Sequence, residues 1–249
     1  MPGSELACGS IQLPFGPAFD RHWIGGHFRS ACSIKTFDKL YARTYFSKMG
    51  RVSVREDILN AGLAVMLRLG YQAASVRDIC AAAGAPHGSF INHFGSKEAF
   101  AREVLDRYFE GTKRHVKEAL DDKSLTPRQR LTRYLDIITG VLTDAKWNRG
   151  CLIGDFSLET TSQSKLLRRR LDAIFREWRA SFAACIAEAQ AMGEIDSTFD
   201  PIDLAEFFLS SWEGAILRMK VERDPAALER FKRIAFQTVF NKPSATNRN

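Results

Sequence analysis

Residues 75–100 read SVRDICAAAGAPHGSFINHFGSKEAF, and this stretch decides the fold. Ser75 is a favoured residue for the N-terminal cap of a helix, and Asp78 follows it at the third position. The Gly-Ala-Pro sequence that follows interrupts the helical pattern, and a second polar and aromatic segment begins after it. We therefore predict a helix over 75–83 and a short helix over 87–94, joined by a tight turn. Two such helices form a helix-turn-helix unit.

The second helix of this pair is too short to be stable alone in water. Phe90 and Phe94 lie on one side of it, and we expect them to pack against the neighbouring helices. Its other side is polar, and outward polar residues at the start of such a helix are placed to reach base edges and phosphates in a major groove. The residues on this side are His87, Gly88, Ser89, Asn92 and His93.

The remainder of the chain favours helices and shows no convincing β alternation. Capping residues, Pro at first turns and Gly at ends set the expected bounds. We predict an all-α protein of about nine helices, with a three-helix head and a C-terminal helical bundle for ligand binding and dimerisation. The expected helices span about 53–70, 75–83, 87–94, 96–120, 126–145, 151–159, 164–192, 200–221 and 224–240.

The first 48 residues differ from the rest, because Gly, Pro and aromatic residues occur there without a sustained period. Met49 is followed by Ser53 and Glu56, which form a possible capping box, so that the protein resembles one that starts at Met49. We expect residues 1–48 to be translated upstream sequence or a disordered arm. The expected domains are 49–96 for the head and 97–242 for ligand binding and dimerisation, with a frayed tail at 243–249.

Composition excludes several classes of protein. The 249 residues have a net charge of +7 without a block of like charges, so basicity alone does not identify a nucleic-acid partner. No apolar run is long enough for a membrane span. Five cysteines without a C-x-x-C pair favour a reduced, cytoplasmic chain. Motifs of metalloproteases, P-loop proteins and serine hydrolases are absent, so we expect no enzyme, no cofactor and no metal.

Residues 53–108 closely resemble the DNA-binding head of the TetR family of repressors, in REDILNAG at 55–62 and throughout the stretch quoted above. The resemblance implies an all-α homodimer that reads a near-palindromic operator and releases it when a small inducer binds. It places Ser75, Arg77 and Lys97 near phosphates, and it implies that the polar side of the short helix faces DNA. The family usually has Tyr at the position of Ile91, so one phosphate contact is expected to be missing.

The segment RGCLIGDFSLE at 149–159 is similar to one in a TetR subgroup related to the N-ethylmaleimide-reductase and acrylate-responsive repressors. A helix N-terminus and the nearby Arg149 are expected to favour the thiolate of Cys151 and to lower its pKa, although Cys151 can equally be a small buried core residue. Lys220 is a second cation that could face the same cavity. Expected ligand or sensor residues are Trp147, Cys151, Phe156, Trp178, Trp212 and Lys220.

Three points stay open at the level of sequence. Broad apolar faces on the last two helices favour an isologous dimer interface, and their residues are Leu204, Phe207, Phe208, Ser211, Trp212, Phe231, Ile234, Ala235, Thr238 and Val239. The inducer could be electrophilic if Cys151 reacts with it. The alternative function is a helical ligand sensor or thiol redox sensor that does not bind DNA, which the missing Tyr allows.

Overall fold

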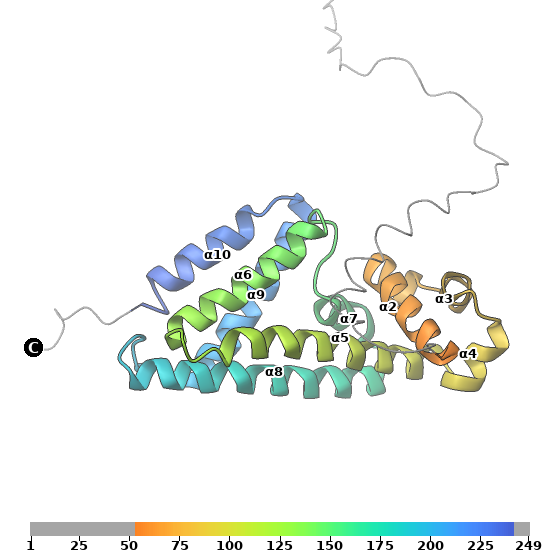
Figure 1. The fold of residues 1–249 in the computed structure, drawn as a ribbon, viewed down its shortest axis with the longest axis horizontal. Helices are drawn as coiled ribbons and strands as arrows, with labels where there is room; N and C mark the ends of the chain where they lie inside the picture. The colour runs from red at the N-terminus through yellow and green to blue at the C-terminus, as the bar shows by residue number, and fades with distance from the viewer. Residues whose placement is uncertain (1–52, 242–249) are drawn as a thin grey trace, which may run out of the picture. The chain divides into compact units, whose positions relative to one another are not determined.

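The computed structural model describes residues 53–241, and the expectations for residues 1–48 and 243–249 lie outside this range. The described residues form nine α-helices and no strand, as predicted (Figure 1). The helices are α2 (Val54–Ala73), α3 (Val76–Ala83), α4 (His87–Phe94), α5 (Lys97–Leu120), α6 (Pro127–Asp144), α7 (Leu152–Thr160), α8 (Lys165–Ala191), α9 (Pro201–Glu222) and α10 (Ala226–Gln237).

Side-chain caps explain why most of these helices begin where they do. Ser75 and Asp78 form a reciprocal capping box at α3, and Thr126 with Gln129 forms another at α6. The box predicted at the start of α2 is only half present. Ser53 accepts the N–H of Glu56, but the Glu56 carboxylate pairs with Arg107 of α5 at 2.6 Å. An ion pair with another helix has therefore replaced the local cap.

The head consists of α2, α3 and α4, and an aromatic cluster holds the short α4 in place. Phe90 and Phe94 are buried against Phe100 of α5, with ring centroids 4.8 and 4.7 Å apart, respectively. The Phe100 ring fits because α2 has Gly62 there, where an added Cβ would lie 2.1 Å from a ring carbon. Gly84 has a φ of 63° and makes the turn between α3 and α4. These contacts confirm the predicted clamping of α4.

The body contains α5 to α10, and long apolar stripes bury its core. In Figure 1, α5 and α8 lie side by side, and α9 packs on α8 and α10. Leu166 and Phe175 belong to the apolar pattern of α8, but Leu166 is exposed and Phe175 is half-buried. The core-facing residues of α8 are Leu167, Leu171, Ile174, Trp178, Phe182, Cys185 and Ile186.

The apolar faces that were expected to form a dimer interface are partly internal. Leu204, Phe208, Trp212 and Ala235 are buried within the protomer, because α9 and α10 use these residues to cover α8 and one another. The exposed side of α9 carries apolar and small residues at alternating spacings of three and four, which places them on one face. These residues are Phe207, Ser210, Gly214, Leu217 and Val221.

Among residues 53–241, no helix combines the length and the apolar character that crossing a membrane requires. In the same range, His, Cys, Asp and Glu side chains nowhere gather in threes as a metal site would need. The three cysteines of this range, Cys80, Cys151 and Cys185, are buried free thiols.

Candidate functional site

The polar side of α4 is displayed on the surface of the head. His87, Gly88, Asn92 and His93 are exposed and Ser89 is half-buried, while the two phenylalanines of the same helix face inward. An added Cβ at Gly88 would meet no atom within 4 Å, so the backbone of α4 is openly accessible there. Ile91 is 46% exposed on the same surface. The structure therefore brings together all of the side chains that were predicted to face DNA from this helix.

The start of α3 adds two exposed side chains to this surface, Ser75 and Arg77. The Ser75 hydroxyl is already engaged, since it accepts the N–H of Asp78 and donates to the Asp78 carboxylate at 2.5 Å. These hydrogen bonds from Ser75 lower the pKa of Asp78. Arg77, the second residue of α3, takes no part in this cap, so it is the freer of the two to reach toward a phosphate.

Lys97, which was predicted to contact a phosphate, has protein partners in this structure. Its ammonium group donates to the backbone carbonyl of Gln72 at 3.2 Å and lies 4.6 Å from the centroid of the Tyr71 ring. Burial lowers the pKa of Lys97, and the negative charge of Glu159 opposes that shift. Lys97 therefore satisfies the C-terminal end of α2 at the edge of the head.

A junction between the head and α7 lies at the same place, and sequence analysis did not find it. The Glu159 carboxylate of α7 accepts the backbone N–H of Gln72 at 2.7 Å, and the Gln72 side chain donates to the Glu159 carbonyl and to Gln163. Tyr71 meets the edge of Phe156, also of α7, at 5.6 Å between ring centroids. We call the contacts of Tyr71 and Gln72 with Phe156 and Glu159 the α2–α7 junction.

Gly70 is required for the α2–α7 junction. Its φ of 78° and ψ of 177° interrupt the helical backbone of α2, in a region that only glycine enters readily. A Cβ at this position would lie 2.3 Å from Oε1 of Glu159. The first helix was expected to end at Gly70, but α2 continues to Ala73 beyond an interruption at this residue, and the interruption admits a carboxylate from α7.

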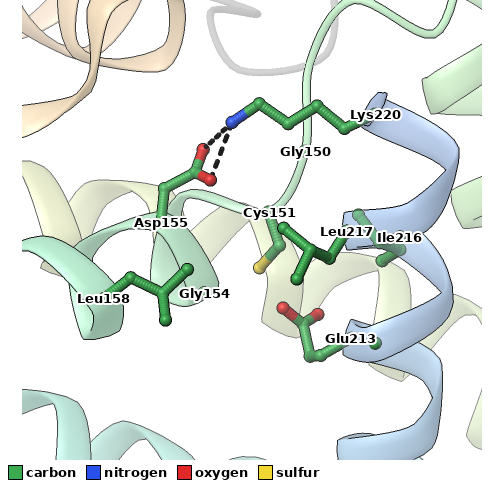
Figure 2. Close-up of a pocket in the computed structure, with 10 residues that line it drawn as sticks. Gly150, Cys151, Gly154, Asp155, Leu158, Glu213, Ile216, Leu217 and Lys220 are labelled. Atoms are coloured by element: carbon green, nitrogen blue, oxygen red, sulfur yellow. Dashed lines mark hydrogen bonds and ion pairs between the residues drawn. The ribbon is translucent and has the colours of Figure 1, made fainter. Parts of the chain in front are cut away.

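A cavity of about 190 Å³ lies at the other side of α7, between this helix and α9 (Figure 2). From the α7 side, Leu158 stands 74% exposed at its rim. The residues that line the cavity are Gly150, Cys151, Gly154, Asp155, Leu158, Glu213, Gly214, Ile216, Leu217 and Lys220.

Two of the expected ligand residues, Cys151 and Lys220, both line this cavity. The Lys220 ammonium pairs with both carboxylate oxygens of Asp155, at 2.8 and 2.9 Å (Figure 2). The predicted lowering of the Cys151 pKa is wrong. Burial raises this pKa well above its usual value, and the negative charge of Glu213 raises it further, against a lowering by the backbone N–H of Gly154. Cys151 is a protonated, buried thiol.

Glu213 also lines the cavity, and sequence analysis did not single it out. Burial raises the pKa of its carboxyl group to about 7, a hydrogen bond with the Cys151 thiol lowers it, and the charge of Asp155 raises it. Its Oε1 is buried and has no hydrogen-bond partner among the described residues. Gly154 permits this position, because a Cβ there would lie 2.7 Å from the second carboxyl oxygen. Figure 2 shows the carboxyl group facing the sulfur of Cys151.

The other four expected ligand residues lie elsewhere. Trp178 and Trp212 are buried in the core formed by α8 and α9, and Phe156 belongs to the α2–α7 junction. Trp147 is half-buried in the loop between α6 and α7, with a φ of 58°. These aromatic residues were expected to line a pocket because they are large and apolar. The two tryptophans instead lie on the buried apolar faces of α8 and α9, where they pack in the core.

Comparison with known proteins matches both parts of the chain to one family. Residues 58–104 match the model for bacterial regulatory proteins of the tetR family, and residues 127–235 match the tetracyclin repressor-like C-terminal domain. The chain is 41% identical to the HTH-type transcriptional repressor DhaR of Mycobacterium sp. (strain GP1), over 80% of this chain and 98% of that protein.

Two further relatives extend this comparison. The transcriptional regulator AcuR of Cereibacter sphaeroides is 34% identical over 72% of this chain and 81% of that protein. A cysteine mutant of the TetR family transcriptional regulator CifR, solved in complex with double-strand operator DNA, is 26% identical with a TM-score of 0.64. That alignment covers 74% of this chain and 97% of the other.

Proposed function

Since this chain belongs to the TetR family of DNA-binding transcriptional repressors, we propose that a small molecule in the cavity between α7 and α9 releases it from a near-palindromic operator. The protein is accordingly a regulator and not an enzyme. The observation that carries the proposal is the double role of α7. One side of this helix lines the cavity, and the other holds the head through the α2–α7 junction.

The head supplies the operator contacts in this proposal. Asn92 is the best candidate for reading a base, because its amide can pair with adenine through two hydrogen bonds. His87, Ser89 and His93 reach base edges or phosphates, and the exposed Gly88 lets the backbone of α4 approach the duplex. The relative CifR binds operator DNA as a double strand, which supports the same partner for this chain.

Phosphate contacts fix the head on the duplex. Arg77 supplies one from the start of α3, and Ser75 lies beside it. Lys97 reaches a phosphate only by exchanging the Gln72 carbonyl for it, so its contact links DNA binding to the α2–α7 junction. Ile91 cannot donate a hydrogen bond to the backbone, which is a loss of about 0.5–1.5 kcal/mol for each half-site.

We expect the operator to be released because ligand binding in the cavity and the α2–α7 junction favour different positions of α7. A ligand that enters between α7 and α9 contacts Gly154, Asp155 and Leu158, so it favours positions of α7 that enlarge the cavity. A displaced α7 moves Glu159 away from Gln72 and frees the C-terminal end of α2. Coupling of this kind between two sites is typically 1–3 kcal/mol, or about 5- to 150-fold in affinity for DNA.

A homodimer completes the proposed repressor, because a near-palindromic operator offers two equivalent half-sites. The exposed face of α9 defined above, together with Ile234 of α10, is suited to an isologous interface. Ser210 and Gly214 on this face are small and would let two copies of α9 approach closely. Since a bacterial regulator of this kind meets its operator on the chromosome, we place the protein in the cytoplasm.

An electrophilic inducer is a special case of this proposal. Cys151 lines the cavity, so a ligand held there is close to its sulfur. The raised pKa makes the resting thiol a slow nucleophile. Above about pH 7 the neighbouring carboxyl group of Glu213 is mainly ionised, and this carboxylate is the group that could take the thiol proton. Reversible binding is therefore the main proposal, and covalent capture is the second candidate.

The deciding experiment measures DNA binding and its release. Fluorescence anisotropy with the DNA upstream of the protein's own gene should show saturable, salt-dependent binding. Glu159→Ala, which removes the carboxylate contact of the α2–α7 junction, should keep this binding but weaken the response to an inducer found by screening for release. Glu118→Ala, at an exposed position of α5, is the control. A protein that never binds this DNA would instead be a sensor without DNA binding, and an unchanged response in Glu159→Ala would refute the route through α7.

A further inference from the structure

The carboxyl group of Glu213 is the only buried polar group among the described residues that faces the cavity without a complete set of partners. Glu213 belongs to α9, and its residue as a whole is half-buried, but its Oε1 has no contact with solvent and no hydrogen bond. A buried polar atom in this state is destabilising, because it has lost its hydrogen bonds to water without gaining others. A bound molecule that supplies the missing hydrogen bond recovers this free energy on binding.

The charges that surround Glu213 are already balanced. Lys220 and Asp155 pair with each other at the mouth of the cavity through two short contacts (Figure 2). Cys151, the remaining titratable group that lines the cavity, is protonated and hydrogen-bonded to Glu213. The cavity therefore offers no unpaired positive charge to an anionic ligand, and its environment favours the neutral form of the Glu213 carboxyl group.

We propose that Glu213 recognises the inducer through a single hydrogen bond, and that the inducer is a small, uncharged, largely apolar molecule with one polar group. This inference rests on the proposed function, because it names the ligand class of the same cavity. The carboxyl group donates to a carbonyl, ether or hydroxyl oxygen of such a molecule. Leu158, Ile216 and Leu217 contact its apolar part.

The size of the cavity limits the ligand further. An engineered protein cavity of about 150 Å³ is large enough for benzene, and this one measures about 190 Å³. A single ring with one polar substituent, or a branched chain of similar volume, fills it. A carboxylate of the same size fits sterically but would place its charge beside Glu213 and Asp155 without a counter-charge, so we expect it to be rejected.

Three probes of nearly equal size test the proposal with the full-length protein, namely benzyl alcohol, benzoate and benzylamine. Calorimetric titration at about pH 6, where the Glu213 carboxyl group is mainly neutral, should show binding of benzyl alcohol and at least tenfold weaker binding of the two ions. Glu213→Leu should weaken the binding of benzyl alcohol about fivefold, the typical value of one hydrogen bond. Glu213→Gln keeps a hydrogen-bonding group and should bind within about twofold of the wild type.

The control is Glu206→Leu, which makes the same exchange at an exposed position two turns earlier on α9 and should leave probe binding unchanged. Circular dichroism of each variant shows whether it is folded. Equal binding of benzoate and benzyl alcohol, tighter binding of benzylamine, an unaffected Glu213→Leu variant, or no binding of any probe up to about 10 mM would each overturn the inference.

Operator release is measured separately, so that the two proposals can fail independently. If benzyl alcohol binds through Glu213 and no ligand of the cavity ever releases DNA, the proposed function fails and the assignment of Glu213 stands. If a different inducer releases DNA from the wild type and from Glu213→Leu at the same concentration, the assignment of Glu213 fails and the repressor function stands.

Discussion

Replacing Glu213 by Gln should change how the stability of the protein depends on pH. The pKa of Glu213 is raised from 4.5 to about 7 in the folded protein, chiefly by burial. At pH values below 4.5 the carboxyl group is protonated in both the folded and unfolded states, so it contributes no difference. As the pH rises toward 7, the unfolded state releases a proton that the folded state retains, and the free energy of unfolding falls.

The magnitude follows from the same two values. Each pH unit between them corresponds to about 1.4 kcal/mol, so the wild type should lose on the order of 3 kcal/mol by about pH 8 through this one group. Because Glu213 is only half-buried as a residue, solvent screening will reduce the loss, and about 1 kcal/mol is a reasonable lower expectation. The amide of Gln does not titrate, so the Glu213→Gln variant lacks this loss.

Urea denaturation at a fixed protein concentration, at several pH values between about 5 and 8, measures the effect. The stability of Glu213→Gln relative to the wild type should rise by 1–3 kcal/mol across this window, on the order of the two limits above. Glu206→Gln, at an exposed position of α9, should show a constant difference from the wild type. If the stability difference between Glu213→Gln and the wild type also stayed constant with pH, this carboxyl group would not be buried in the way that the structure describes.

Three other predictions concern the head, the junction and the thiol. Gly70→Ala should destabilise the protein by about 1–3 kcal/mol in urea denaturation and weaken the response to inducer. Gly84→Ala, at a φ of 63° in open space, should lose only about 1 kcal/mol and respond to inducer normally. Equal losses of stability in the two variants would contradict the clash with Glu159. Lys97→Ala should weaken binding to all DNA sequences alike and reduce the salt slope by about one per half-site, while Asn92→Ala should relax base preference, and identical behaviour would count against these roles. N-ethylmaleimide should release operator DNA from the wild type slowly and faster at higher pH; the same release from Cys151→Ser would eliminate this thiol as the sensor.

Local patterns predicted the helices because the residues that start and end a helix act within a few positions of one another. Ser75 and Thr126 cap α3 and α6 as expected, and Phe90 and Phe94 clamp α4 as expected. The one predicted cap that is incomplete involves Glu56, whose carboxylate found a stronger partner in another helix. A local motif fails where a distant charge competes for the same side chain.

The candidate site was less accessible from the sequence, because it is built from contacts between distant residues. Gln72 and Glu159 are 87 positions apart, and neither residue belongs to a motif that indicates the other. Glu213 lies on a helix with many polar residues, and only the packing of α9 against α7 shows that its carboxyl group is buried. The pKa of Cys151 was misjudged for the same reason, since its helix N-terminus was visible in the sequence and the neighbouring carboxyl group was not.

The head is attached to the body through α5 and through α7, and the difference between these two attachments explains why a ligand should act through α7. Near the start of α2, three side-chain contacts tie this helix to α5, since Arg55 pairs with Glu103 and Arg107 contacts Glu56 and Asn60. None of these residues lines the cavity. The α2–α7 junction differs from these contacts, because α7 itself also lines the cavity.

A ligand shifts an equilibrium only through contacts that differ between the two states. Contacts with the cavity side of α7 change when this helix moves, whereas the α2–α5 ion pairs are untouched by the ligand. We therefore expect the head to pivot on α5 when the α2–α7 junction opens, which changes the separation of the two α4 helices in a dimer without unfolding either head. Removing the Arg107 contacts should then weaken DNA binding with or without inducer, whereas removing Glu159 should weaken only the difference between the two states.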